Sequence, residues 1–300
     1  FDILEANNEA KNPRISVHHA SQVIGMDEHP GQALRKKKDA SVVVATSLVR
    51  DNRCDAVIAP GSTGAAVAAA LFGLGRIKGI DRPVIATPMP TVSGITVMLD
   101  SGANSNSKPK HLVQGALMGS EYAKLLLGKE NPTVGLLNIG EEATKGNDVV
   151  LATYPILEGM KTINFKGNIE GRDIPKGAVD VVVCDGFVGN VVLKFAEGLV
   201  TGLTQLVKDS IMAGSIFAKI GAMLVKPALK KMAKRLDHTE NGGAPLLGVN
   251  GVFMIAHGSS KAKEIKTAIE IASDLVERKI IQHIRETMDI EGALKYDYDE

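Results

Sequence analysis

A short loop of small residues, Gly61-Ser62-Thr63-Gly64, has the composition of an anion-binding turn. Glycine lets backbone N–H groups approach an anion closely, and the Ala-rich helix predicted to follow would favour negative charge at its N-terminus. No Lys-Ser or Lys-Thr pair follows, so the loop is not a nucleotide-binding P-loop. An ordinary tight turn in which Ser62 or Thr63 caps the helix is the alternative interpretation.

A single lysine, Lys145, stands just before another predicted helix. A lysine in this position could hold a phosphate or stabilise an oxyanion. We place Asn147, two residues later, with it among the predicted substrate-binding residues. The alternative is a solvated loop lysine that pairs with Glu141 or Glu142.

A third loop, Asp185-Gly186-Phe187-Val188-Gly189-Asn190, follows the most apolar predicted strand. Its two glycines are predicted to contact substrate. Asn190 could donate a hydrogen bond from its side-chain amide to a developing oxyanion, or it could simply cap the helix that follows. Asp185 could orient Lys145 or a hydroxyl group, or it could be a turn residue.

A fourth polar loop begins at His257 and continues with Gly258, Ser259 and Ser260. His257 could bind an anion or relay a proton, and Ser259 is a further candidate for substrate binding. A structural, hydrogen-bonded histidine is the alternative for His257.

The two cysteines, Cys54 and Cys184, lie far apart in apolar runs, and we expect two buried free thiols. Cys184 could be an acyl-enzyme nucleophile, but this would require exposure and a partner base. Its place at the end of an apolar strand favours a core role. No Cys or His cluster has the spacing of a metal site, so we expect no metal.

The polar loops follow apolar runs rich in Val and Ile, which alternate with segments of helical length. This alternation predicts an α/β fold with three layers, α/β/α, and a mostly parallel sheet covered on both faces. Because the carboxyl ends of parallel strands meet at one edge, we expect the loops to converge there. The predicted strands are 55–60, 84–87, 96–100, 134–139, 162–165, 179–184 and 252–256. The predicted helices are about 40–52, 63–75, 109–128, 146–159, 190–211 and 260–288.

The composition is that of a globular protein. The chain has 300 residues, of which 44% are hydrophobic, and a net charge of +1, so the whole molecule should not attract nucleic acid. No run of roughly 18 or more apolar residues occurs, so no transmembrane helix is expected. The free thiols suit a cytoplasmic location.

One apolar segment, Ser210–Val225, interrupts the alternation and contains Lys219 as its only charge. We expect one α/β domain over 1–300 with a protruding helical hairpin over 207–236. An apolar hairpin followed by lysines can lie on an anionic membrane surface. The predicted membrane contacts are Ile216, Phe217, Ile220 and Leu224. A dimer interface or a helix pair packed on the core is the alternative.

Taken together and in order, several of these motifs resemble the bacterial phosphate acyltransferase family PlsX. The resemblance covers nearly the whole chain. It rests on Ala59–Ala65, Gly75–Pro83, Leu137–Glu141, Lys145–Asn147, Asp185–Asn190, Asn241–Gly248 and His257–Ser260. The family begins with a strand and a Gly-rich loop, Asp-Ala-Met-Gly-Gly-Asp, that have no counterpart here, and we expect part of the anion site to be missing with them.

The resemblance implies that the chain makes acyl phosphate from acyl-acyl carrier protein and inorganic phosphate, for phospholipid synthesis, without a cofactor. It also implies a homodimer with a fold similar to isocitrate and isopropylmalate dehydrogenases and to phosphate acetyltransferase. By the same resemblance Lys145 and Asn190 are catalytic, and the hairpin over Ser210–Lys231 attaches the enzyme to the inner face of the membrane.

Phosphate can act as its own nucleophile, so the site would need only to position it and to stabilise the oxyanion. We expect Gly61–Gly64 to form part of the anion cradle, with Asp185 helping to orient the site. The carrier protein is acidic, and the basic run Arg35–Lys38 or the lysines after Val225 could receive it.

Three other functions compete with this one. A phosphate acetyltransferase-like enzyme would use acyl-coenzyme A. A dehydrogenase of the same fold would need a nicotinamide cofactor and metal-binding aspartates clustered at one strand end, whereas we find only Asp100 and Asp185 as candidates, and they are scattered. A non-catalytic membrane scaffold would keep the hairpin but would not need the polar loops.

Overall fold

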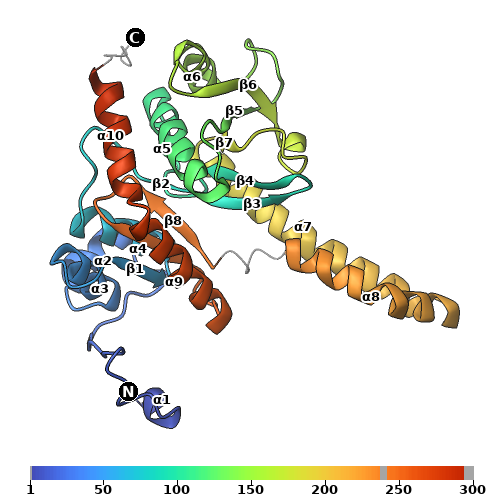
Figure 1. Cartoon of the computed structure of the whole chain (residues 1–300), viewed down its shortest axis with the longest axis horizontal. Coiled ribbons are helices and arrows are strands. Elements are labelled where there is room, and N and C mark those ends of the chain that lie inside the picture. Colours follow the sequence, from blue (N-terminus) through green and yellow to red (C-terminus); the bar gives the residue numbers. More distant parts are fainter. Residues whose placement is uncertain (1, 237–241, 294–300) are drawn as a thin grey trace.

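The computed structural model describes residues 2–236 and 242–293, which are arranged as shown in Figure 1. Within these residues the strands form a four-stranded sheet, β1-β9-β8-β2, and a five-stranded sheet, β3-β4-β7-β5-β6. The first contains β1 (Ala56–Pro60), β9 (Val252–Ala256), β8 (Ala244–Leu247) and β2 (Val84–Ile85). The second contains β3 (Thr87–Thr91), β4 (Gly94–Leu99), β7 (Val181–Val183), β5 (Thr133–Asn138) and β6 (Asn164–Glu170).

The five-stranded sheet is parallel except at one edge. β4, β7, β5 and β6 run in the same direction, and Leu99 and Leu136 are both in register with Val183. The loops that leave β4, β7 and β5 therefore start side by side at one edge of the sheet. The edge strand β3 pairs antiparallel with β4. It contains Pro88 and Pro90, which lack an N–H group and are tolerated where no further strand must pair.

Helices cover both faces of this sheet. On one face, α5 (Pro109–Leu127) approaches so closely that a Cβ atom on Gly119 would lie 2.6 Å from Leu99 Cδ2 and 2.9 Å from Val181 Cγ1. On the other face, Val192 of α7 (Gly186–Ala213) packs against the cluster that contains Cys184. α6 (Asp148–Gly159) connects β5 to β6. The predicted α/β class and mostly parallel sheet are confirmed.

In the four-stranded sheet, β1 and β9 are parallel and their carboxyl ends lie together. The Gly61 N–H donates to the Ala256 carbonyl oxygen at 3.3 Å. One face, with Val57 and Phe253, packs against α3 (Ser41–Arg50) and α4 (Thr63–Gly73). The opposite face contacts α9 (Ala262–Glu277).

The two sheets meet between β2 and β3. The Ala86 N–H donates to the Pro245 carbonyl oxygen at 3.1 Å, and the Ser101 N–H donates to the Ile85 carbonyl oxygen at 3.0 Å. The loop after β4 is thereby attached to the neighbouring sheet. Its Ala103 packs against the core cluster of that sheet.

Helices α7 and α8 (Ile216–Leu236) form a long hairpin that projects from the body of the molecule in Figure 1. The turn lies at Gly214 and Ser215, so the first arm starts at the sheet edge and not near position 207. Much of the apolar surface is uncovered, with Phe195 68% and Phe217 81% exposed. Among the described residues, α7 is the helix whose length and composition would allow it to cross a membrane.

Some elements differ from the prediction. The strands β3 and β8 and the short helices α1 (Asp2–Ala6) and α2 (Pro30–Lys36) were not predicted. The predicted helix over 260–288 is interrupted before α10 (Ile280–Ala293), where Lys279 adopts a left-handed conformation with φ 54°. The prediction for Cys54 is wrong, because this thiol is exposed, whereas Cys184 is buried as expected.

Candidate active site

A buried carboxylate, Asp100, holds the loop that follows β4. The residue is 3% exposed. Its oxygens accept hydrogen bonds from the N–H groups of Ile85 (3.1 Å), Gly102 (3.1 Å), Ala103 (2.9 Å) and Asn104 (2.8 Å), and from the Asn104 side-chain amide (2.8 Å). Burial raises the pKa of the Asp100 carboxyl, and the donated hydrogen bonds oppose that rise. This carboxylate therefore fixes the loop and ties it to β2.

The first turn of α7 packs directly onto the Asp100 loop. A Cβ atom on Gly186 would lie 2.6 Å from Asp100 Oδ2, and one on Gly189 would overlap the Asp100 carbonyl oxygen. Only residues without a side chain fit at these two positions. The close packing accounts for both glycines, and their predicted contact with substrate stays a prediction.

Asp185 and Asn190 lie at opposite ends of this first turn. Asp185 caps α7, because its Oδ1 atom accepts hydrogen bonds from the N–H groups of Phe187 and Val188, both at 3.0 Å. The exposed Asn190 side chain lies beside Gly102, where a Cβ atom would be 3.5 Å from Asn190 Oδ1. Asn190 therefore reaches the Asp100 loop.

The loop that carries Lys145 is held by two asparagines. Asn138, the last residue of β5, donates from Nδ2 to the Lys145 carbonyl oxygen at 2.8 Å. Asn168, a buried residue of β6, donates to the Glu142 carbonyl oxygen at 2.9 Å. The aliphatic part of Lys145 passes over Gly140, where a Cβ atom would lie 3.1 Å from Lys145 Cγ.

The Lys145 ammonium is available to an anion. In the part of the chain that the structure describes, no ion pair joins Lys145 to Glu141 or Glu142. Asn147 caps α6, with Oδ1 accepting a hydrogen bond from the Val150 N–H at 3.0 Å. The Asn147 side chain thus has a structural role in addition to its predicted role in substrate binding.

Strand order brings the Lys145 loop close to the α7 N-terminus. β7 lies between β4 and β5, so Asn190 follows the central strand, with the Asp100 loop on one side and the Lys145 loop on the other. Two large apolar side chains are exposed at the same edge, Ile139 at 79% and Phe187 at 65%. The edge thus combines a cation, an amide donor and apolar surface.

The other two predicted loops meet at the edge of the four-stranded sheet. The expected convergence of all the loops at a single sheet edge is therefore wrong, because β1 and β9 belong to one sheet and β5 and β7 to the other. A Cβ atom on Gly258 would lie 3.6 Å from Gly61 Cα. Ser62 caps α4 by accepting a hydrogen bond from the Ala65 N–H at 3.4 Å, while Thr63 and Gly64 form the first turn of this helix.

The fourth loop is folded on itself. His257 Nδ1 and Ser259 Oγ are 2.7 Å apart, and the Ser259 N–H also donates to this ring nitrogen at 3.2 Å. The structural alternative that the sequence left open for His257 therefore has direct support, since Nδ1 is engaged within its own loop.

Cys184 has none of the features of a nucleophile. Burial raises the pKa of its thiol well above the usual value. The Sγ atom lies 3.6 Å from the Asp100 carbonyl oxygen, inside the core. Within the described residues, no group of three or more His, Cys, Asp or Glu side chains could hold a metal ion.

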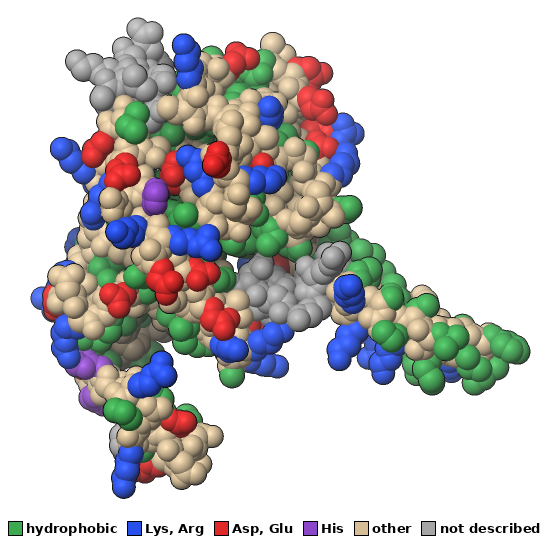
Figure 2. All heavy atoms as spheres, in the orientation of Figure 1, with side chains coloured by type: hydrophobic (Ala, Val, Ile, Leu, Met, Phe, Trp, Pro, Cys, Tyr) green, Lys and Arg blue, Asp and Glu red, His purple; other side chains and the backbone are tan. Residues whose placement is uncertain are grey.

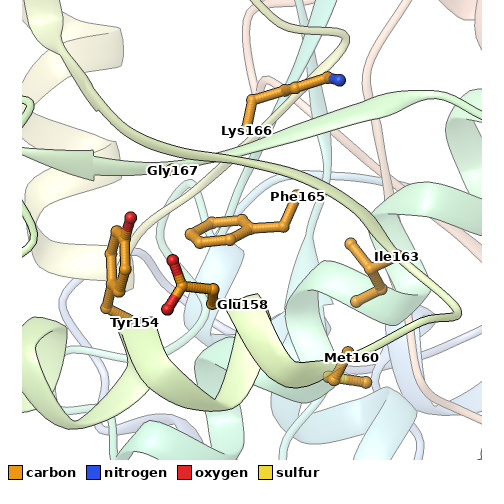
Figure 3. Close-up of a pocket in the computed structure, with 7 residues that line it drawn as sticks. All are labelled: Tyr154, Glu158, Met160, Ile163, Phe165, Lys166 and Gly167. Atoms are coloured by element: carbon orange, nitrogen blue, oxygen red, sulfur yellow. The ribbon is translucent and has the colours of Figure 1, made fainter.

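A cavity of about 360 Å³ lies elsewhere, between α6 and β6. Figure 3 shows Glu158 beside the rings of Tyr154 and Phe165, which meet edge to face at 5.3 Å, while Lys166 points away from them. Met160 and Ile163, which also line the cavity, belong to the connection that leads into the amino end of β6. The cavity is therefore separate from the strand ends that carry Lys145 and Asn190.

Asp100, Asn104 and Asn138 are the site-building residues that sequence reasoning missed. Residues 100–104 have the composition of a turn, but which side chain would accept its N–H groups could not be read from the sequence. Asn138 belongs to the motif Leu137–Glu141, but its hydrogen-bond partner, the Lys145 carbonyl oxygen, lies on the far side of the same loop.

Removal of the Asp100 carboxylate should strongly destabilise the protein. We expect Asp100→Ala to lower the free energy of unfolding by ~3–5 kcal/mol, because buried N–H groups lose their acceptor. Asp100→Asn, which keeps one acceptor oxygen, should lose less. Asp51→Ala, at an exposed ion pair, should change stability by less than ~0.5 kcal/mol. Urea unfolding followed by circular dichroism measures all three, and equal stability of Asp100→Ala and Asp51→Ala would contradict the role of this carboxylate.

The sequence and the fold each have known relatives. The model of the family described as "Fatty acid synthesis protein" matches residues 2–283. "Phosphate acyltransferase" of Desulfitobacterium hafniense (strain DSM 10664 / DCB-2) is 55% identical over 276 residues, which are 92% of this chain and 82% of the relative. The protein of the same name from Heliobacterium modesticaldum is 55% identical over 284 residues, or 95% of this chain and 84% of the relative.

Solved structures with low sequence identity share the fold. The EutD phosphotransacetylase from Staphylococcus aureus superimposes with a TM-score of 0.60 at 14% identity, over 92% of this chain and 82% of its own. A branched-chain phosphotransacylase from Enterococcus faecalis V583 gives 0.52 at 15% identity, over 79% of each chain. From the family match and from relatives that are 55% identical over most of their length, the chain belongs to the fatty acid synthesis protein family, among members named phosphate acyltransferase.

Proposed function

We propose that this chain transfers an acyl group from a thioester to inorganic phosphate and so forms an acyl phosphate. The observation that carries the proposal is the arrangement of the Lys145 loop and the α7 N-terminus on adjacent strands, at one edge of the sheet. Relatives named phosphate acyltransferase, at 55% identity, support the same reaction.

In the proposed reaction, a phosphate oxygen attacks the carbonyl carbon of the thioester, and the carbonyl oxygen becomes an oxyanion. Collapse of the tetrahedral species re-forms the carbonyl and breaks the C–S bond, and the leaving thiolate takes a proton from solvent. Because phosphate is the nucleophile, no side chain needs to be activated. Catalysis then consists of positioning and of oxyanion stabilisation.

Lys145 and Asn190 take the two central roles in this proposal. The Lys145 ammonium, which forms no ion pair with any residue that the structure describes, neutralises the phosphate or the oxyanion, and the exposed Asn190 amide donates to the oxyanion. Asp185 acts through α7, since it caps the helix turn that presents Asn190. Asn147 and the loop with Gly61-Ser62-Thr63-Gly64 contact the phosphate.

We infer that the donor is an acyl carrier protein with a long acyl chain. Ile139 and Phe187 are exposed beside the candidate catalytic residues and could contact an apolar chain or the pantetheine arm. A short acyl-coenzyme A is the competing donor, consistent with the phosphotransacetylase named among the structural neighbours.

Membrane attachment and dimer formation are proposed for the hairpin. Its outer part is covered with hydrophobic side chains in Figure 2, whereas lysines lie nearer the body of the molecule. The predicted contacts are exposed: Ile216 by 65%, Phe217 by 81%, Ile220 by 49% and Leu224 by 78%. Apolar and basic groups together suit the anionic inner face of a membrane. The exposed apolar side chains of α7, of which Phe195 is one, could be covered by a second copy of the chain in a homodimer.

Labelled phosphate tests the reaction and its residues together. The protein should form labelled acyl phosphate from long-chain acyl-acyl carrier protein in preference to acetyl-coenzyme A. Lys145→Ala and Asn190→Ala should each lower kcat by ~10²–10³, because each removes stabilisation of developing charge. Lys166→Ala, in the separate cavity, should leave kcat unchanged. If both site variants keep the normal rate, the assignment is wrong.

Gly140→Ala should impair the reaction without unfolding the protein. Its new Cβ would lie 3.1 Å from Lys145 Cγ and 2.9 Å from Glu142 Oε2, and both are flexible side chains that can move away. Displacing Lys145 by about 1 Å should reduce kcat by ~10–10². Gly171→Ala, where nothing lies within 4 Å, is the matched control. Steady-state kinetics and thermal melting separate the two effects, and a normal kcat for Gly140→Ala would show that the Lys145 position is unimportant.

The hairpin proposal can be tested by flotation with anionic vesicles. The double variant Ile216→Glu/Phe217→Glu should no longer float, because both charged side chains would have to enter the membrane interface. Val92→Glu, at an apolar residue that is 90% exposed between β3 and β4, should float like the wild type. Undiminished flotation of the double variant would refute the proposed contact.

A further inference from the structure

The start of α5 and the segment before β2 together form a basic patch. Residues 76–83 and 105–111 contain five cationic side chains and one acidic residue, Asp81. The cations are Arg76, Lys78, Arg82, Lys108 and Lys110. The whole chain has a net charge of only +1, so a local excess of four positive charges in these two segments stands out from the average.

Side-chain hydrogen bonds join these two segments rigidly. Gln114 of α5 accepts from the Asp81 N–H at 2.9 Å and donates to the Gly79 carbonyl oxygen at 2.8 Å. Lys110 Nζ lies 3.3 Å from Asp81 Oδ2. The arrangement holds Arg82 next to the first turn of α5, so the patch is built by the fold and not by flexible tails.

The cations of the patch surround His111. The pKa of His111 is lowered first by burial and then by the positive charges of Arg82, Lys108 and Lys110, while Asp81 opposes the shift. Arg82 and Lys108 are both exposed. A protein surface that carries carboxylates could therefore approach them.

The patch lies at the rim of the candidate active site. A Cβ atom on Gly115 of α5 would lie 3.9 Å from the side chains of Leu99 and Val183, the last residues of β4 and β7. Pro109 is six residues earlier, so the first turn extends ~9 Å past these strand ends. The Asn104 amide, part of the Asp100 loop, donates to the Pro83 carbonyl oxygen at 2.7 Å and links the patch to that loop.

We propose that this surface, which we call the α5 patch, docks the acidic protein that carries the acyl thioester. The proposal rests on the function proposed above, and it replaces the basic segments expected from the sequence. In one of these, Lys37 is already bound to Glu28 at 2.6 Å and to the Val23 carbonyl oxygen at 2.8 Å. Complementary charge at the rim would steer the carrier so that its arm enters between the strand-end loops.

Charge reversal tests the α5 patch. Arg82→Glu/Lys108→Glu should raise KM for acyl-acyl carrier protein about 10-fold and leave kcat unchanged, because docking is weakened and chemistry is not. The uncharged N-acetylcysteamine thioester of the same acyl group should react at the wild-type rate. Added salt should raise KM of the wild type and have little effect on the variant.

Three other double variants, in which two cationic residues are likewise replaced by glutamate, serve as controls. They are Lys161→Glu/Lys166→Glu beside the separate cavity, Arg35→Glu/Lys38→Glu, and Lys226→Glu/Lys230→Glu on the hairpin. All should keep the wild-type KM for the carrier. The proposal would be overturned if one of these variants had a raised KM for the carrier while Arg82→Glu/Lys108→Glu had a normal KM. It would also be overturned if Arg82→Glu/Lys108→Glu slowed the reaction of the uncharged thioester as much as that of the carrier. If the wild type forms no acyl phosphate from either donor, the proposed function fails and this inference fails with it.

Discussion

The buried carboxylate of Asp100 is the interaction on which the rest of the site depends. It accepts hydrogen bonds from the loop after β4 and from the end of β2, so one side chain fixes a loop and joins two sheets. The first turn of α7 can then pack on that loop only because Gly186 and Gly189 have no side chains. The position of Asn190 is therefore set by the Asp100 carboxylate, which lies in the loop after a different strand, β4.

The chemistry follows from the order of the strands. A central strand, β7, delivers an amide donor, and its neighbour β5 delivers a lysine held by Asn138 and Asn168. Such a site offers preorganised positive charge and hydrogen-bond donors, which is what attack by phosphate on a thioester requires. The only cysteine near the site, among the described residues, is buried and forms part of the core. Positioning, and not covalent catalysis, is the chemistry that these side chains support.

Much of the fold could be predicted from hydrophobic pattern alone. β1 and β9 are continuous apolar runs that end in glycine-rich or polar turns, which makes buried parallel strands easy to recognise. β3 was missed because Pro88 and Pro90 argue against a strand in any position except an edge. The interruption at Lys279 was missed because no glycine or proline marks the left-handed turn.

The candidate site was predictable in part. Its loops could be identified because each follows an apolar strand, and parallel strands bring their ends together. What the sequence does not reveal is which polar side chain binds which loop. The Asn104 side-chain amide donates a hydrogen bond to the Asp100 carboxylate within the same loop, and Asp185 caps a helix. These roles depend on contacts made after folding, and a local pattern such as Asp-Ser-Gly is compatible with many of them.

A crystal structure with arsenate, an anomalously scattering analogue of phosphate, would show directly whether Lys145 and Asn190 share one anion site. We expect one ordered anion at the carboxyl edge of the five-stranded sheet, within hydrogen-bond distance of Lys145 Nζ and adjacent to the Asn190 amide. An anion bound elsewhere, with Lys145 and Asn190 directed away from each other, would contradict this expectation.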